Sequence, residues 1–213
     1  MNRSFEVRQA LMNSAIRVVS VQGIQNATTK ALSVDSGLSE VYIYRYFKSK
    51  DDLLKQTFNA LDKELMHLMK KSLSTIDISE NENVKLGFKV VFHDFWRFTL
   101  GDRDKCSFFI QYYYSSYYSS HSEEERKAIY QPLLDMIAQA FAEGSDPWTE
   151  LNHMYDVAFP KLLRVIRGTI PDSAETEANV YREVEMIEER NMLWNKKVQR
   201  VSQRQLGGKN NNG

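Results

Sequence analysis

Cysteine, proline and glycine are all scarce in this chain of 213 residues. The single cysteine, Cys106, has no second thiol in the chain with which to form a disulfide. The sequence also lacks a basic-then-apolar segment of the signal-peptide type and an uncharged apolar run long enough to cross a bilayer. We therefore expect a soluble, cytoplasmic protein with no membrane partner.

The patterns that mark metal sites and enzyme active sites are also missing. The four histidines, His67, His93, His121 and His153, are scattered and form no His-x-x-x-His pair or Cys/His cluster. A glycine-rich phosphate loop and a Gly-x-Ser-x-Gly elbow are absent, and no activating pattern surrounds Cys106. We expect no metal, no cofactor and no enzymatic activity.

Long stretches carry apolar residues at three-to-four spacing, while strand-like alternation is hard to find. This pattern predicts an all-α fold. Pro160 should kink the eighth predicted helix or divide it in two. The predicted helices cover about residues 4–22, 29–35, 40–46, 51–74, 83–99, 104–119, 122–143, 148–167 and 174–204.

The charge distribution divides the chain. Residues 1–56 hold eight basic and five acidic side chains, so this part carries about +3 and the remainder about −3 in a neutral chain. Such an asymmetry is compatible with a nucleic-acid contact at the front of the chain. We expect a small helical domain over residues 1–50, a linking helix over 51–74, a helical bundle over 75–204 and a disordered tail over 205–213.

Residues 29–46 have the layout of a helix-turn-helix. Thr28 or Thr29 can cap a short helix, Gly37 suits the turn that follows, and Ser39 can cap the next short helix. Ser49 can then cap the long linking helix. This arrangement inserts its second helix into a DNA major groove.

The run of residues around this motif resembles the signature of the TetR family of transcriptional regulators over about residues 8–58. Departures are Ser33 and Ser36 where alanine is usual and Leu38 where valine is usual, and all three are small. The resemblance rests on Thr28-Thr29, Leu32, Ser36-Gly37-Leu38-Ser39 and the stretch Tyr42-Ile43-Tyr44-Arg45-Tyr46-Phe47-Lys48-Ser49-Lys50.

This resemblance implies an N-terminal three-helix DNA-binding domain and a C-terminal ligand-binding and dimerisation domain. It implies a ligand-responsive regulator, most simply a repressor. Such a protein binds a palindromic double-stranded DNA operator as a homodimer and is released by a small-molecule effector. The signal would run through the linking helix, and its sign, induction or corepression, stays open.

Several residues are expected to hold the DNA backbone. Tyr44 and Lys50 resemble the family's phosphate-contacting tyrosine and lysine, and Lys48 could add a further contact. Thr28 or Thr29 can present a hydroxyl and backbone N–H groups to a phosphate, besides capping its helix.

Base reading is expected from the start of the third helix, at Ser39, Glu40, Val41, Tyr42 and Arg45, because Ile43, Tyr46 and Phe47 should pack inward. Glu40 either accepts from a cytosine amino group or favours the helix N-terminus. Val41 or Tyr42 could touch a thymine methyl group. Arg45 could read guanine or pair with phosphate.

The segment from Phe108 to Tyr118 is unusually aromatic. An aromatic stripe at helical spacing is more often core than a pocket, and the family resemblance favours some lining role. The residues chosen for an effector pocket are Phe92, Trp96, Phe109, Tyr112, Tyr113 and Ser116.

Apolar residues at alternating four-and-three steps form a narrow seam on the last helix, which predicts a partner helix. In the expected dimer, the last two helices of each subunit form a four-helix interface. The residues assigned to it are Leu162, Ile166, Val180, Val184, Ile187, Asn191, Trp194 and Val198.

Three rival interpretations remain. The first is a dimeric DNA-binding regulator without a small-molecule effector, and a saturable cavity would argue against it. The second is a helical binding module with a vestigial helix-turn-helix, which fits poorly with the complete stretch from Tyr44 to Lys50. The third is an enzyme of unknown type.

Overall fold

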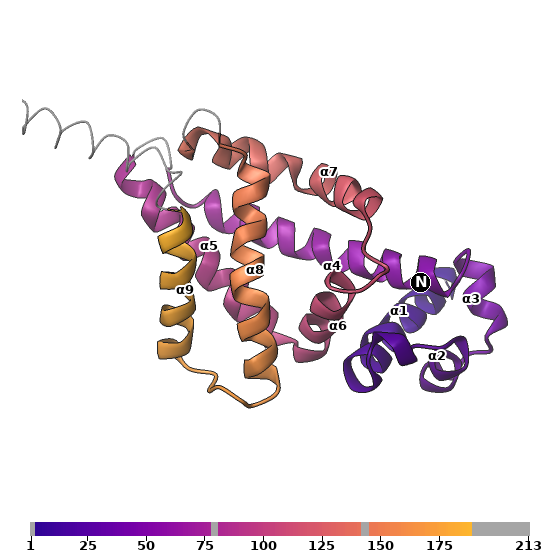
Figure 1. Cartoon of the computed structure of the whole chain (residues 1–213). Coiled ribbons are helices and arrows are strands. Elements are labelled where there is room, and N and C mark those ends of the chain that lie inside the picture. The colour runs from indigo at the N-terminus through magenta and orange to yellow at the C-terminus, as the bar shows by residue number, and fades with distance from the viewer. Residues whose placement is uncertain (1–2, 78–80, 142–144, 189–213) are drawn as a thin grey trace, which may run out of the picture. The chain divides into compact units, whose positions relative to one another are not determined.

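The computed structural model describes residues 3–77, 81–141 and 145–188. In these ranges the chain forms nine α-helices and two short 3₁₀ helices, with no strand of a sheet (Figure 1). The predicted all-α fold is therefore confirmed. None of the described helices is long and apolar enough to cross a membrane.

The described residues form two compact units that alternate along the chain. Unit 1 takes its residues from Met1–His67 and Arg97–Tyr130, and unit 2 from Leu68–Trp96 and Gln131–Gly213. The boundaries between the units fall inside three helices: α4 (Lys50–Leu73), α5 (Asn81–Gly101) and α7 (Ser120–Ile137). The expected division into residues 1–50, 51–74 and 75–204 stays a prediction about function.

Unit 1 begins with α1 (Arg3–Gln22), the 3₁₀ helix η1 (Ile24–Asn26), α2 (Thr29–Ser36) and α3 (Val41–Tyr46). α2 and α3 both pack against α1 (Figure 1). Leu11 of α1, Leu32 of α2 and Ile43 of α3 are fully buried. Burial of these apolar side chains holds the three helices together.

α6 (Arg103–Tyr113) supports the same unit, because it packs along α1. Gln111 of α6 donates to the Val19 carbonyl over 3.0 Å and accepts from the Ile24 backbone over 3.1 Å. Ser20 donates to Asp104 over 2.7 Å. These bonds satisfy polar groups at the end of α1, where Gly23 takes a positive φ of 86°.

α6 ends earlier than the expected residue 119. Beyond Tyr113 the backbone forms successive turns, and the Ser115 hydroxyl donates to the Tyr112 carbonyl and accepts from the Tyr117 amide. A serine side chain that bonds to nearby backbone in this way competes with helix propagation. The segment between α6 and α7 is therefore an ordered run of turns.

Unit 2 contains α8 (Pro147–Ile166), the 3₁₀ helix η2 (Ala138–Ala140), α9 (Ala174–Glu188) and parts of α4, α5 and α7. α8 and α9 pack against each other (Figure 1). Of the two effects expected of Pro160, division of the helix is wrong, since α8 is continuous across it, and a kink stays a prediction. Proline has no N–H, so the Asp156 carbonyl loses its helical hydrogen-bond donor at Pro160. Both residues are exposed, so water can bind that carbonyl oxygen instead.

One further expectation differs from the structure, and another lies outside the described residues. Ser39 was expected to cap α3, but the capping position belongs to Glu40, which has helical backbone angles and makes no side-chain capping bond. α3 instead starts through a backbone turn in which Tyr42 donates to the Ser39 carbonyl over 2.9 Å. The predicted helix from residue 189 to 204 and the tail of residues 205–213 lie outside the described residues.

Candidate functional site

The N-terminus of α2 is capped by Thr28. Its hydroxyl accepts a hydrogen bond from the Ala31 amide over 3.1 Å, and its backbone is extended. Thr28 is exposed, whereas Thr29 begins the helix and is half-buried. The choice between the two threonines therefore falls on Thr28 as the cap.

The turn between α2 and α3 depends on Gly37, which has φ 69° and ψ 14°. A Cβ at this position would meet no atom within 4 Å, so the left-handed backbone is what requires glycine. The Ser33 hydroxyl donates to the Leu38 carbonyl over 2.6 Å, and the Leu38 amide donates to the Ser36 hydroxyl over 3.3 Å. The two serines thus satisfy the backbone of the turn.

α3 has one buried and one exposed face. Ile43 is fully buried and Phe47, just past the helix, is nearly so, while Val41 is 69% and Tyr44 61% exposed. Tyr46, which was expected to pack inward, is half-buried. Six of the ten residues expected to contact DNA are exposed: Thr28, Ser39, Val41, Tyr44, Arg45 and Lys48. The other four are half-buried: Thr29, Glu40, Tyr42 and Lys50.

The ring of Tyr42 stacks on that of Tyr46 with centroids 6.2 Å apart. The guanidinium of Arg45 lies 5.8 Å from the centroid of the same Tyr46 ring. These contacts restrict the side chains that flank the exposed face of α3. A face that is already ordered loses less conformational entropy when it binds a partner.

Arg8 joins α1 to the end of α3 and to α4. It donates to the Tyr46 carbonyl over 2.8 Å and to the Gln56 side chain over 2.6 Å, and its guanidinium lies 4.5 Å from the Phe47 ring centroid. In the sequence Arg8 is one of the eight basic residues among residues 1–56, and no motif indicates these contacts. Its partners lie 38 and 48 residues away, so no local pattern could have identified them.

An ion pair between Arg17 and Asp35 holds α2 on α1. Arg17 donates to both carboxylate oxygens of Asp35, the shortest distance being 2.6 Å from Nη2 to Oδ2. Burial alone would raise the pKa of Asp35, but the hydrogen bonds from Arg17 and Ser14 outweigh it and hold that pKa below its ordinary value. Asp35 therefore stays charged at neutral pH.

The start of α4 is capped as the sequence predicts. The Asp52 amide donates to the Ser49 hydroxyl over 3.1 Å, and the Asp52 carboxylate accepts from the Lys48 amide over 2.9 Å. The Lys48 side chain is exposed. The Lys50 ammonium donates to the Tyr117 hydroxyl over 2.7 Å.

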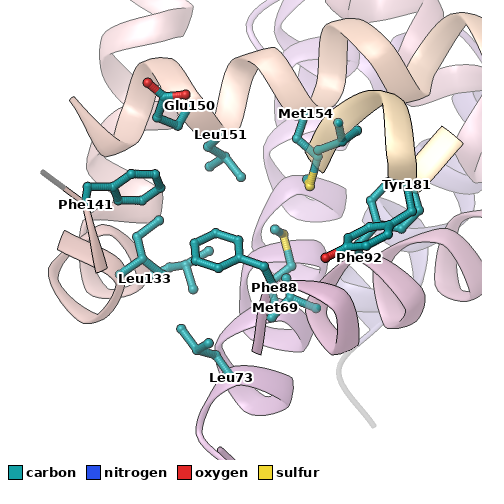
Figure 2. A pocket seen from close by; sticks show the side chains of 13 residues that line it. Met69, Leu73, Phe88, Phe92, Leu133, Phe141, Glu150, Leu151, Met154 and Tyr181 are labelled. Carbon is teal, nitrogen blue, oxygen red and sulfur yellow. The ribbon is translucent and has the colours of Figure 1, made fainter. Parts of the chain in front are cut away.

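Unit 2 contains an apolar cavity of about 30 Å³. Phe88 lies near the middle of its lining in Figure 2, with Phe141 and Glu150 at one edge and Tyr181 at the other. Nearly all of the lining is hydrocarbon, aromatic ring or thioether. The lining residues are Met69, Leu73, Phe88, Val91, Phe92, Leu133, Ile137, Phe141, Glu150, Leu151, Met154, Tyr181 and Val184.

The structure does not bring the six expected pocket residues together. Phe92 lines the cavity. Trp96 is buried and does not line it, and its ring stacks on that of Phe92 with centroids 6.0 Å apart. The other four, Phe109, Tyr112, Tyr113 and Ser116, belong to unit 1.

There the rings of Phe109 and Tyr112 each stack on Phe58 with centroids 4.6 Å apart. Tyr113 is half-buried and Ser116 is exposed. The aromatic run is thus largely the core of unit 1. Apolar spacing alone could not distinguish that core from the cavity of unit 2.

Glu150 is the charged member of the cavity lining and is 4% exposed. Its Oε2 lies 3.5 Å from Nδ1 of His153, one turn further along α8. Glu150 also stands in the first turn of α8, where the helix dipole favours a negative charge. Among the described residues no group of three histidine, cysteine or acidic side chains could hold a metal ion.

The residues assigned to a dimer interface occupy several environments. Leu162, Val180 and Val184 are buried within the single chain, and Ile166 is half-buried. These side chains contribute to the core around the packed helices α8 and α9. The burial of Ile187 is not described, and Asn191, Trp194 and Val198 lie outside the described residues.

Residues 11–57 match the family model of bacterial regulatory proteins of the tetR family. The match begins in α1 and ends in α4, so it contains α2, the Gly37 turn and α3. None of the curated proteins matches the chain in sequence.

Solved structures share the fold over most of the chain. A TetR family transcription regulator from Marinobacter aquaeolei VT8 is similar with a TM-score of 0.70 and 18% identity, over 85% of this chain and 95% of that one. A putative tetR family regulator from Shewanella sp. PV-4 has a TM-score of 0.70 and 15% identity, over 88% and 98%. The regulator FadR from Bacillus subtilis, solved with stearoyl-CoA, has a TM-score of 0.64 and 15% identity, over 84% and 96%.

Proposed function

Since the chain belongs to the TetR family of helix-turn-helix transcriptional regulators, we propose that it is a cytoplasmic, ligand-responsive repressor. It binds a palindromic operator as a homodimer and leaves that operator when a small-molecule effector binds. The observation that carries the proposal is the exposed face of α3. Val41, Tyr44 and Arg45 are exposed there, while Ile43 is buried on the opposite face.

In the proposed complex α3 lies in the major groove. Val41 and Tyr42 are placed to touch a thymine methyl group, Arg45 to donate to guanine or phosphate, and Glu40 to accept from a cytosine amino group. Ser39, at the start of the same face, adds a hydroxyl. The absence of a capping bond from the Glu40 side chain leaves its carboxylate available for such a contact.

Phosphate contacts fix the protein on the duplex without reading sequence. Tyr44 and Lys48 are exposed on either side of the end of α3, and Lys50 begins α4. Thr28, with the first amides of α2, offers a further contact, and Thr29 adds a half-buried hydroxyl beside it. Together these groups make a basic and hydroxyl-rich border around the base-reading residues.

The apolar cavity of unit 2 is the proposed effector site. Its lining suits a ligand with an apolar body, and the structural neighbour FadR was solved in complex with stearoyl-CoA. About 30 Å³ has room for little more than a water molecule, so an effector must open the site. Met69 and Met154 supply side chains that repack easily.

The chain itself connects the cavity with the DNA-binding helices. Met69 and Leu73 line the cavity from the last turns of α4, and Lys50 begins the same helix, capped by Ser49, just after α3 in the chain. An effector that moves the end of α4 therefore acts on a helix that enters the DNA-binding unit. The operator and the effector then each favour a different position of α4.

The proposed homodimer supplies the second half of a palindrome. We place its interface on α8 and α9, and the predicted seam continues in residues 189–204. Leu162, Val180 and Val184 support that surface from within the subunit. A variant that prevents dimerisation is expected to lose operator affinity without unfolding.

The small cavity also favours a second candidate function, that of a dimeric DNA-binding regulator without an effector. In that case Phe88, Phe92 and Met154 form only a packed core. The two candidates differ in whether an apolar ligand raises the thermal midpoint further as its concentration increases.

The experiment that tests the function selects operator DNA from fragments of the source genome with purified protein. Selection is made at about 50 and 200 mM salt, because specific phosphate contacts give steep salt dependence. The expected result is a palindromic sequence bound by two subunits and released by an apolar ligand that also raises the thermal midpoint. Failure to enrich any sequence at either salt concentration would contradict DNA-binding regulation.

A further inference from the structure

We propose that Tyr117 is a positioning residue for the operator contact of Lys50. It lies between α6 and α7, far from the helix-turn-helix in sequence, and holds the Lys50 ammonium at the start of α4. The inference rests on the proposed function and adds to it a residue that none of the motifs includes.

The contact between the two residues is close and has two components. Nζ of Lys50 donates to Oη of Tyr117 over 2.7 Å, and the same nitrogen lies 5.0 Å from the centroid of the Tyr117 ring. The Lys50 side chain is 24% exposed, so it is not sealed in the core. Oδ1 of Asp51 is 3.6 Å from this nitrogen on a side chain that is 65% exposed, which makes it the weaker partner.

Tyr117 is itself anchored to the core of unit 1. Its ring stacks on Tyr112 with centroids 6.3 Å apart, and Tyr112 in turn stacks on buried Phe58. The Tyr117 amide donates to the Ser115 hydroxyl over 3.2 Å. These contacts restrain the Tyr117 side chain and so fix the phenol oxygen that accepts from Lys50.

An ammonium group has three N–H donors, and Tyr117 uses one of them. The other two donors make no hydrogen bond to a described residue, since Asp51 is 3.6 Å away, and they can turn to a phosphate that approaches the start of α4. A lysine side chain loses much rotamer freedom when it is ordered, and here Tyr117 orders it before DNA arrives. Lys48 has an exposed side chain and serves as the comparison.

This placement gives the segment between α6 and α7 an influence on operator affinity. A shift of residues 114–119 would move the phenol away from Lys50 and release the ammonium. Such a release needs no displacement of α3. The Tyr117 contact is thus a second path to the DNA surface, which reaches Lys50 from the α6–α7 segment and does not run along α4.

The test is a double-mutant cycle on the selected operator. Tyr117→Phe removes the hydroxyl and keeps the ring that stacks on Tyr112. We expect Kd to rise about three- to tenfold, which is the change in affinity that the loss of one charge-assisted hydrogen bond produces. The same substitution in a Lys50→Met background is expected to change Kd by less than about 1.5-fold.

Two controls separate positioning from general damage. Tyr117→Phe combined with Lys48→Met should keep its full effect, because Lys48 does not contact Tyr117 in the proposed scheme. Tyr114→Phe, an exposed tyrosine in the same segment, should leave Kd unchanged. Urea unfolding of each variant confirms that the protein is folded at the assay temperature.

Several results would overturn the inference while wild-type operator binding stands. These are an unchanged or tighter Kd for Tyr117→Phe, an equal loss in the Lys50→Met background, and no effect of Lys50→Met by itself. Absence of specific binding by the wild-type protein would instead overturn the proposed function, and the inference with it.

Discussion

Arg126 donates from Nε to Oδ2 of Asp62 over 3.0 Å, and neither side chain has exposed surface. Tyr130 donates to the other carboxylate oxygen over 2.7 Å. The guanidinium also lies over the rings of Tyr130, Tyr113 and Phe109, at 5.1, 5.3 and 5.9 Å. This cluster joins the first part of α7 to the part of α4 that leaves the DNA-binding helices.

Removal of one member should leave a buried charge without its counterion. Arg126→Met is therefore expected to lower the free energy of unfolding by about 3–5 kcal/mol, measured by urea titration at pH 7. The control is Lys105→Met, because the Lys105–Glu64 pair is exposed on both sides. That change should cost less than about 1 kcal/mol, and equal losses for the two variants would contradict the role given to burial.

The thiol of Cys106 should be unreactive in the folded protein. Burial raises its pKa to about 12, and the nearby charge of Asp102 adds to the effect. Because the thiolate is the reactive form, an aromatic disulfide reagent at pH 8 is expected to label native protein at least about 100-fold more slowly than protein in urea. Native labelling as fast as in urea would show that the thiol is accessible.

Asp52 should stabilise the start of α4 in a pH-dependent way. Burial alone would raise its pKa, but the hydrogen bonds from the Lys48 backbone and the Gln56 side chain, with nearby lysine charges, lower it overall. A lowered folded-state pKa contributes stability above the unfolded value, near 4, which is lost as the pH falls through the folded value.

Asp52→Asn is therefore expected to cost about 1 kcal/mol at pH 7 and progressively less below pH 4. Urea titrations between pH 3 and pH 7 measure this difference. Asp51→Asn is the matched control, since Asp51 is in the same helical turn with 65% of its side chain exposed. A constant cost for Asp52→Asn across this range would contradict a charged cap.

Glu40 provides a test of base reading. If its carboxylate accepts from a cytosine, Glu40→Gln should change the preference at one base pair in each half-site by roughly 1–3 kcal/mol and leave the other positions unaltered. Binding to all single-base variants of the selected operator measures this. A uniform change at every position would mean that Glu40 acts through charge alone.

The helix-turn-helix could be predicted from the sequence because its determinants are local. Thr28 caps α2 through the Ala31 amide three residues away, Gly37 takes the backbone conformation that glycine favours, and Ser49 caps α4. Each of these depends on neighbours within a single turn of chain. The buried positions of Leu32 and Ile43 followed from helical spacing.

The remaining features depend on contacts between distant parts of the chain. Arg8 meets Tyr46 and Gln56, and Lys50 meets Tyr117, 67 residues away. The cavity combines five helices whose apolar stripes have the same spacing as those of an ordinary core. Residue spacing on one helix does not specify which stripes face a cavity.

The central claim is that the exposed face around α3 binds one specific DNA sequence. The most direct measurement is fluorescence anisotropy of the selected operator and of a scrambled duplex between 50 and 200 mM salt, with wild type and a Val41→Ala, Tyr44→Ala, Lys48→Ala variant. The account predicts at least about 1,000-fold preference of the wild type for the operator. The variant should lose most of this preference and have a shallower salt dependence. Equal wild-type affinity for both duplexes, or an unaltered variant, would contradict the account.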